Sequence, residues 1–231
     1  MEEKRLSFVH PGTFGDTLYG MSAVKLLGGG DVYIKLNGMN EVAWNAFGMV
    51  DAGVHKGRYT QKDLDFLFPL LEAQSYIHKL DVYRNEAVDH DLGQHYRWTT
   101  GPNGWQGNQT ECYALVCGLD INQYKKELLI DPWLDPVEPL RDPGRSVIIN
   151  RTGRYLQGSD PNSKTWRKWV YEGLDQVASF VGTEQECEEF NRQFKCRVPY
   201  RKVSDLLEMA RLIQGAEQVM GNQSIALAIA I

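Results

Sequence analysis

The chain has 231 residues, of which 42% are hydrophobic and 24% are charged. These proportions exclude disorder as the default state, and the length fits one large domain or two small ones. The formal net charge of −5 argues against a generic cationic surface for nucleic acids. We expect no signal peptide and no transmembrane segment. The four cysteines form no C-x-x-C pair, so we expect reduced thiols in a cytoplasmic protein.

The stretch from residue 10 to residue 20 links a predicted strand to a predicted helix. Residues 6–9 are apolar, which is typical of a buried strand, and residues 21–27 have the apolar spacing of a helix. Open α/β sheets bind ligands at such a point, where Gly12, Thr13 and Gly15 form the loop backbone. Asp16 either caps the helix or faces a cleft as a general base, and the stretch itself leaves both roles open.

The rest of the first half alternates between strand and helix. Gly28 and Gly118 are natural helix stops. Thr60 is followed by a helical pattern of leucines and a phenylalanine, which indicates a capped helix start. We expect strands at residues 31–36, 75–83 and 88–92, and helices at residues 40–50, from residue 60 through at least residue 71, and from residue 108 or 110 to residue 117.

Residues 93–110 form a predicted long loop with four glycines, one proline and two tryptophans. Structureless loops of more than about 12–15 residues are uncommon and are usually functional or disordered. The aromatic residues argue against plain disorder. They either pin the loop against the core or form a stacking and hydrogen-bonding surface for an acceptor. The candidates for that surface are His95, Tyr96, Trp98 and Trp105, with Arg97 beside them.

Four prolines in residues 131–144 predict a linker between two domains. The N-terminal domain then covers residues 1–130 and the second covers residues 145–231. The second half again alternates, with strands expected at residues 145–150, 177–181 and 218–220 and helices at residues 169–174, 184–194, 204–213 and 226–231. Because the chain stops in an apolar segment, we expect the second domain to be short or incomplete. Two such domains imply a cleft that takes a small molecule.

Four signals together resemble glycosyltransferase family 9, the ADP-heptose:lipopolysaccharide heptosyltransferases and their relatives. They are a Gly15-Asp16 loop before a small-residue helix, a strand at residues 147–150 that leads to Lys164-Thr165-Trp166, a strand that runs into Gly182 and the acidic residues after it, and the segment L-x5-L-I-x2-A-x4-G-N-x-S at residues 206–224. The signals occur in the family's order. The resemblance is thin between residues 38 and 140.

The resemblance implies a GT-B-like α/β fold of two Rossmann-like domains that face a cleft. The C-terminal domain would hold the nucleotide sugar and the N-terminal domain the acceptor, without a cofactor or a metal. Asp16 matches the family's proposed catalytic base, and Lys164 matches the lysine that contacts donor phosphate. The loop that meets the diphosphate corresponds to Asn222, Gln223 and Ser224. Arg151 and Arg154 are further phosphate candidates, or they belong to a solvated basic loop.

Three departures from the family pattern keep a second class of function open. Gln223 stands where an Asp is common, Ile225 replaces the usual Gly or Pro without the usual His after it, and we expect the family's C-terminal strands and closing helix to be missing. We expect an inverting, metal-independent glycosyltransferase that moves a sugar from a nucleotide-diphosphate sugar to an acceptor hydroxyl. The alternative is a catalytically inactive nucleotide-sugar-binding or partner-binding protein on the same fold. The acceptor candidates are a glycan, a lipid-linked sugar and, with least support, a modified nucleic acid.

Overall fold

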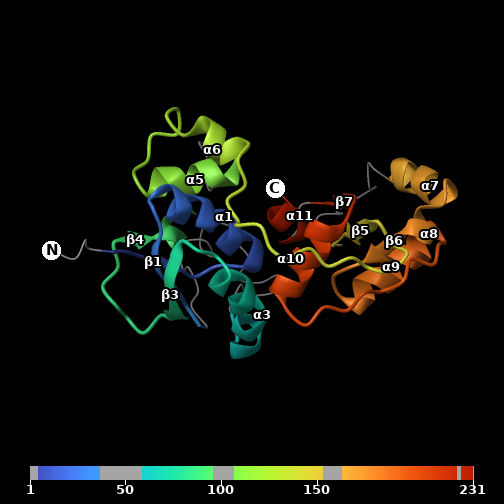
Figure 1. Cartoon of the computed structure of the whole chain (residues 1–231), viewed down its shortest axis with the longest axis horizontal. Helices are drawn as coiled ribbons and strands as arrows, with labels where there is room; N and C mark the ends of the chain where they lie inside the picture. Colours follow the sequence, from blue (N-terminus) through green and yellow to red (C-terminus); the bar gives the residue numbers. More distant parts are fainter. Residues whose placement is uncertain (1–4, 37–58, 96–106, 153–162, 223–224, 231) are drawn as a thin grey trace, which may run out of the picture. The chain divides into compact units, whose positions relative to one another are not determined.

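The computed structural model describes residues 5–36, 59–95, 107–152, 163–222 and 225–230. It divides the chain within the proline-rich segment into two compact units (Figure 1). Unit 1 contains residues 1–135 together with Ile231, and unit 2 contains residues 136–230. Each unit has its own parallel sheet and its own helices, so the predicted α/β class is confirmed.

The sheet of unit 1 has the strand order β3-β2-β1-β4, and every pair is parallel. Val9 in β1 is aligned with Tyr33 in β2 on one side and with Asp91 in β4 on the other. The carboxyl end of β1 therefore lies at the centre of the sheet edge, where parallel α/β sheets bind ligands. The strands are β1 (Leu6–His10), β2 (Gly30–Ile34), β3 (Ile77–Val82) and β4 (His90–Asp91).

Helix α1 (Phe14–Leu26) begins earlier than the sequence predicts, so most of the expected loop at residues 10–20 is helical. Its end is as expected, because Gly28 adopts a φ of 86° and its N–H donates to the Lys25 carbonyl. Helix α3 (Gln61–Glu72) starts with a capping box formed by Thr60 and Asp63. These two boundaries show how much the local capping signals determine.

The remaining described elements of unit 1 begin at the two ends of the predicted loop at residues 93–110 or come after it. They are the 3-10 turn η2 (Leu92–His95), α5 (Gln109–Val116) and the five-residue helix α6 (Lys125–Leu129). Asn108 and Glu111 form the capping box that starts α5. The sequence analysis does not predict α6, because five residues are too few to show a helical period. The helix expected at residues 40–50 lies outside the described residues.

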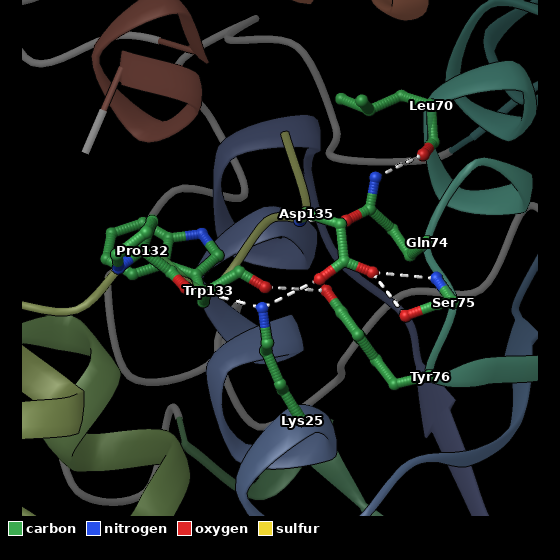
Figure 2. Close-up of polar contacts among 8 residues, drawn as sticks. All are labelled: Lys25, Leu70, Gln74, Ser75, Tyr76, Pro132, Trp133 and Asp135. Carbon is green, nitrogen blue, oxygen red and sulfur yellow. Dashed lines mark hydrogen bonds and ion pairs between the residues drawn. The ribbon is translucent and has the colours of Figure 1, made fainter. Parts of the chain in front are cut away.

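The first part of the predicted linker is packed against unit 1. The indole of Trp133 is buried. The backbone carbonyl of Trp133 accepts a hydrogen bond from the Tyr76 hydroxyl at 2.9 Å. Figure 2 shows the Asp135 carboxylate between Lys25, at 2.8 Å, and Ser75, whose N–H and hydroxyl donate to it at 2.8 and 2.6 Å. Residues 131–135 thus form part of unit 1 and are not a free tether.

The following residues of the segment dock on unit 2. The N–H of Leu140 donates to the Arg211 carbonyl at 2.7 Å, and the Arg211 guanidinium pairs with Glu138 at 3.0 Å. The Leu140 carbonyl lies so close to Gly215 that a Cβ there would be 2.3 Å away. Close backbone approach therefore fixes residues 138–141 to the end of helix α10 (Leu206–Gly215).

The sheet of unit 2 has the order β6-β5-β7, again parallel throughout. Its strands are β5 (Val147–Asn150), β6 (Ala178–Phe180) and β7 (Gln218–Gly221). The other described helices are α7 (Ser163–Tyr171), α8 (Leu174–Val177), α9 (Glu184–Phe194) and α11 (Ile225–Ala230). Helix α7 starts six residues before the predicted helix, whereas α9 has the predicted bounds.

Two of the family-like signals have a structural explanation in unit 2. Trp166 is buried and packs edge-on against Phe190, with ring centroids 5.3 Å apart. The glycine and acidic residues after β6 form a helix start, since Thr183 and Glu186 make a capping box for α9. These side chains hold the fold, whereas Lys164 and Thr165 of the tryptophan signal are exposed.

Candidate functional site

The candidate site of unit 1 is the junction of β1 and α1. Thr13 precedes the helix in an extended conformation, and Asp16 lies in the first helical turn. The Asp16 carboxylate accepts hydrogen bonds from the Thr13 hydroxyl at 3.0 Å and from the Gln109 amide at 2.6 Å. A carboxylate at this place is stabilised by the positive end of the helix dipole. The half-buried Asp16 is thus held at the carboxyl end of the central strand.

Two buried histidines lie beneath this junction in one chain of hydrogen bonds. The N–H of Gly12 donates to Nδ1 of His10 at 3.0 Å, so the proton of the neutral ring is on Nε2, which donates to the Tyr113 hydroxyl at 2.9 Å. At the other end, Nδ1 of His95 lies 2.9 Å from the Leu92 carbonyl. A carbonyl only accepts, so His95 donates from Nδ1 and accepts from Tyr113 through Nε2 at 3.2 Å. Both ends of the hydrogen-bond chain therefore require the same donor direction, from His10 through Tyr113 to His95.

Burial keeps this layer uncharged at neutral pH. It is the main cause that lowers the pKa of His10 to about 3. His95 lowers this pKa further, whereas the negative charge of Asp16 acts to raise it. Burial also lowers the pKa of His95 and raises the pKa of Tyr59 well above its usual value. The Tyr59 hydroxyl lies 2.8 Å from that of Thr17. His10 is fully buried and both of its ring nitrogens are bonded, so it cannot reach an acceptor, and Asp16 is the candidate base at this junction.

The loop glycines have different surroundings from those expected of a ligand-binding loop. The N–H of Gly12 is used by His10 and the residue is buried. Gly15 belongs to the first turn of α1, and a Cβ added there would meet no atom within 4 Å. Gly15 thus has space for a Cβ in the first turn of α1, whereas Gly12 serves the histidine layer.

The predicted acceptor surface is only partly within the described residues. His95 is 1% exposed, and both of its ring nitrogens are bonded within the core. The prediction that His95 lines an acceptor surface is therefore wrong. The 3-10 turn places its ring in the core against Tyr113, with ring centroids 4.3 Å apart. Tyr96, Trp98 and Trp105 lie outside the described residues.

The candidate donor residues belong to unit 2. Arg151 follows β5 and is 5% exposed; its guanidinium donates to Gln193 at 3.0 Å and lies 5.0 Å from the centroid of the Phe194 ring. Asn222 follows β7, and its amide donates to the Thr152 carbonyl at 2.7 Å and accepts from the Thr152 N–H at 3.1 Å. The adjacent strands β5 and β7 thus bring Thr152 and Asn222 together.

The other donor candidates are not joined to this pair by contacts of the described residues. Lys164 is exposed in the first turn of α7. Arg154, Gln223 and Ser224 lie outside the described residues. Within the described part of the chain, no cluster of three or more His, Cys, Asp or Glu side chains has the geometry of a metal site. Of the helices described, none is long and apolar enough to cross a membrane.

Sequence reasoning missed the residues that join distant parts of the site. Gln109 contacts Asp16 across 93 positions of the chain, and Tyr113 contacts His10 across 103. The sequence signal nearest to them is the capping pattern of Asn108 and Glu111, which marks the start of α5 but not its neighbours. Their spacing of four residues puts Gln109 and Tyr113 on one face of that helix.

The chain is similar to known proteins in its fold but not in its sequence. No protein-family description matches the sequence, and no curated protein is similar to it at a significant level. Among solved structures, the chain is similar to a glycosyl transferase family 9 protein from Veillonella parvula, with a TM-score of 0.53, 10% identity, and coverage of 100% of this chain and 79% of the other. It is also similar to the E. coli heptosyltransferase WaaC with ADP-2-deoxy-2-fluoro heptose, with a TM-score of 0.51, 11% identity, and coverage of 98% and 85%. These likenesses confirm the predicted GT-B-like fold.

Proposed function

We propose that the chain is an inverting, metal-independent glycosyltransferase that moves a sugar from a nucleotide-diphosphate sugar to an acceptor hydroxyl. The observation that carries the proposal is the place of Asp16, a carboxylate held by two donors at the carboxyl end of the central strand. The likeness of the fold to two glycosyltransferase structures supports this class of reaction. The E. coli heptosyltransferase was solved with ADP-2-deoxy-2-fluoro heptose, which supports a nucleotide sugar as the donor.

The reaction is a single displacement in which Asp16 is the general base. Asp16 takes the proton of the acceptor hydroxyl while the hydroxyl oxygen bonds to the anomeric carbon of the donor sugar. The bond from that carbon to the diphosphate oxygen breaks, and its electron pair leaves with the nucleoside diphosphate. Because attack and departure take place on opposite faces of the sugar, the configuration inverts. The hydrogen bonds from Thr13 and Gln109 favour the ionised carboxylate that this step needs.

The donor diphosphate gains negative charge as it leaves, and the cations of unit 2 are proposed to stabilise it. Lys164 is exposed and can follow a phosphate on its flexible four-carbon stem. Arg151 is proposed only as a nearby positive charge, because its buried guanidinium is already bonded to Gln193 and lies over the Phe194 ring, which is not the solvated basic loop that was its alternative. The paired amide contacts of Asn222 with Thr152 hold that loop against the end of β7. Arg154, Gln223 and Ser224 are likewise proposed to contact the donor diphosphate.

In this proposal the nucleotide sugar is a co-substrate and no cofactor is resident. The acceptor is a glycan or a lipid-linked sugar. The test starts with a thermal-shift screen of the full chain against ADP-, UDP-, GDP- and CDP-sugars, with and without magnesium. A ligand at about 100 times its dissociation constant adds roughly 2.7 kcal/mol of stability. We expect a rise in melting temperature with one nucleotide class, and magnesium should not change it.

Matched variants connect binding to the proposed residues. Lys164→Ala should weaken the nucleotide-dependent shift, whereas Lys168→Ala, an exposed lysine of the same helix that pairs with Glu172, should leave it unchanged. The absence of a shift with every nucleotide would favour the partner-binding alternative. Binding of a donor without its transfer or hydrolysis would favour the inactive nucleotide-sugar-binding protein, the function to which Ile225 and Gln223 point.

The role of Asp16 is tested by turnover of the donor class found in the screen. Asp16→Asn removes the base but keeps an amide of the same size, so we expect a loss of at least about 100-fold in kcat. Asp65→Asn changes an exposed carboxylate of α3 and should retain full activity. Turnover of Asp16→Asn within a few-fold of the wild type would refute the assignment of the base.

A further inference from the structure

The amide of Gln109 makes a long-range contact with the proposed base. Its Nε2 donates to Oδ1 of Asp16 at 2.6 Å, while the Thr13 hydroxyl donates to Oδ2 at 3.0 Å. Thr13 is the N-cap residue of the helix that contains Asp16, but Gln109 comes from a different helix. Donors on both oxygens fix the plane of the carboxylate, and an ionised acceptor makes each bond stronger than a neutral one.

Two sets of contacts fix helix α5, which carries Gln109. The Asn108 N–H donates to Glu111 at 2.8 Å in the capping box, which makes Gln109 the first residue of the helix. One turn later, the fully buried Tyr113 bonds to His10 at 2.9 Å and to His95 at 3.2 Å. Because residues four apart share a face of a helix, the anchor at Tyr113 directs Gln109 toward α1.

We propose that Gln109 is a positioning residue for the reaction, whose amide holds the Asp16 carboxylate in the orientation and ionised state needed to take the acceptor proton. The reaction meant here is the glycosyl transfer of the proposed function, on which this inference rests. The effect of Gln109 on the Asp16 carboxylate does not depend on that function. A hydrogen bond to the ionised form lowers the proton affinity of a carboxyl group. Loss of the amide therefore keeps the Asp16 carboxyl group protonated up to a higher pH. It also removes one of the donors that fix the plane of the carboxylate.

The amide can be replaced by two side chains of similar length. Gln109→Met keeps the volume and removes the donor. Gln109→Glu replaces the donor with a second carboxylate and is compatible with the first turn of a helix, where acidic side chains are favourable. The matched control is Gln61→Met, since Gln61 also occupies the first position of a helix and donates to a carboxylate, that of Asp65, at 2.9 Å on the exposed face of α3.

The first readout is the carboxyl 13C titration of Asp16 by NMR, assigned by its absence in Asp16→Asn. We expect the pKa of Asp16 to rise by about 0.5–1 unit in Gln109→Met and further in Gln109→Glu, because one hydrogen bond is lost and then a like charge is added. Gln61→Met should leave it unchanged. A merely structural role for Gln109 would not order the variants by the charge of the new side chain. Equal pKa values in the wild type and both Gln109 variants would overturn the proposal.

The second readout is the pH profile of kcat for the donor class found in the screen. The acidic limb should move to higher pH in the same direction as the pKa of the free protein, and kcat should fall about 3- to 30-fold, with a smaller change in KM for the donor. The two proposals can fail separately. A shifted pKa without any transfer retains the positioning contact and rejects the transferase. Transfer that needs Asp16 but is indifferent to both Gln109 variants rejects the positioning role alone.

Discussion

The Asp135 carboxylate lies 2.8 Å from the Lys25 ammonium and thereby ties the end of unit 1 to helix α1. Its second oxygen accepts from the N–H and the hydroxyl of Ser75, and its own N–H donates to the Gln74 side chain at 2.7 Å (Figure 2). Gln74 is itself buried and bonded to the Leu70 carbonyl. The segment that leads to unit 2 is therefore bonded at once to α1, to the end of α3 and to the residues before β3.

Replacement of Asp135 should destabilise unit 1. Asp135→Ala removes a charge-assisted bond to Lys25 and leaves the Ser75 donors without this acceptor, so we expect a loss of about 1–3 kcal/mol in the free energy of unfolding by urea. Asp131→Ala is the control, since its ion pair with Lys126 spans 3.4 Å between side chains that are 43% and 70% exposed. An exposed pair is worth at most about 1 kcal/mol. Equal losses in the two variants would contradict the prediction.

The same contact should depend on pH. Burial acts to raise the pKa of Asp135, but the bonds from Lys25 and Ser75 outweigh it, so that the pKa is lowered. A carboxyl with a lowered pKa stabilises the fold above its unfolded pKa of about 3.9 and loses this contribution as the pH falls through the folded pKa. The difference between the wild type and Asp135→Ala should thus shrink in acid below about pH 4.

The turn after α1 offers a matched pair of glycines. Gly28 and Gly29 have φ values of 86° and 88°, but a Cβ would meet nothing within 4 Å at Gly28 and would lie 2.2 Å from the Tyr76 carbonyl oxygen at Gly29. Gly28→Ala should cost about 1–2 kcal/mol for the left-handed backbone alone. Gly29→Ala adds a clash with the main chain and should cost clearly more or prevent folding. Urea unfolding of both variants, with equal midpoints, would contradict this prediction.

The buried histidines should make the protein sensitive to mild acid. The folded pKa of His10 is about 3 and that of His95 is also lowered, mainly by burial, whereas an unfolded histidine has a pKa of about 6.5. Below pH 6.5 the unfolded chain binds protons that the folded chain does not, so stability falls with pH until the folded pKa is reached. The slope is at most about 1.4 kcal/mol per pH unit for each histidine.

The measurement is the free energy of unfolding by urea at several values between pH 7.5 and pH 4. His10→Gln keeps polar atoms in the layer but does not titrate, so its slope should be smaller than that of the wild type. His78→Gln changes an exposed histidine of β3 and should keep the wild-type slope. Identical slopes in all three proteins would show that His10 does not stay neutral in the folded state.

Local signals in the sequence located most of the described elements. The capped start of α3 at Thr60, the end of α1 at Gly28 and the bounds of α9 follow from side chains within a few residues of each boundary. The start of α1 was misplaced because Gly12 and Gly15 suggest a longer loop, whereas Gly15 is accommodated within the first turn of the helix. The helix α6 was missed because five residues carry no period.

The sequence by itself determined that two α/β halves flank a proline-rich segment and that Asp16 follows the first strand. Only the tertiary structure decided what surrounds that carboxylate. Gln109 reaches Asp16 and Tyr113 reaches His10 because strand order and helix packing bring α5 against the β1–α1 junction. It likewise placed His95 in the core and bonded residues 131–135 to unit 1. Caps and periods are set by neighbours along the chain, whereas the contacts that Gln109, Tyr113, Trp133 and Asp135 make with Asp16, His10, Tyr76 and Lys25 join residues 57 to 110 positions apart, which no local pattern encodes.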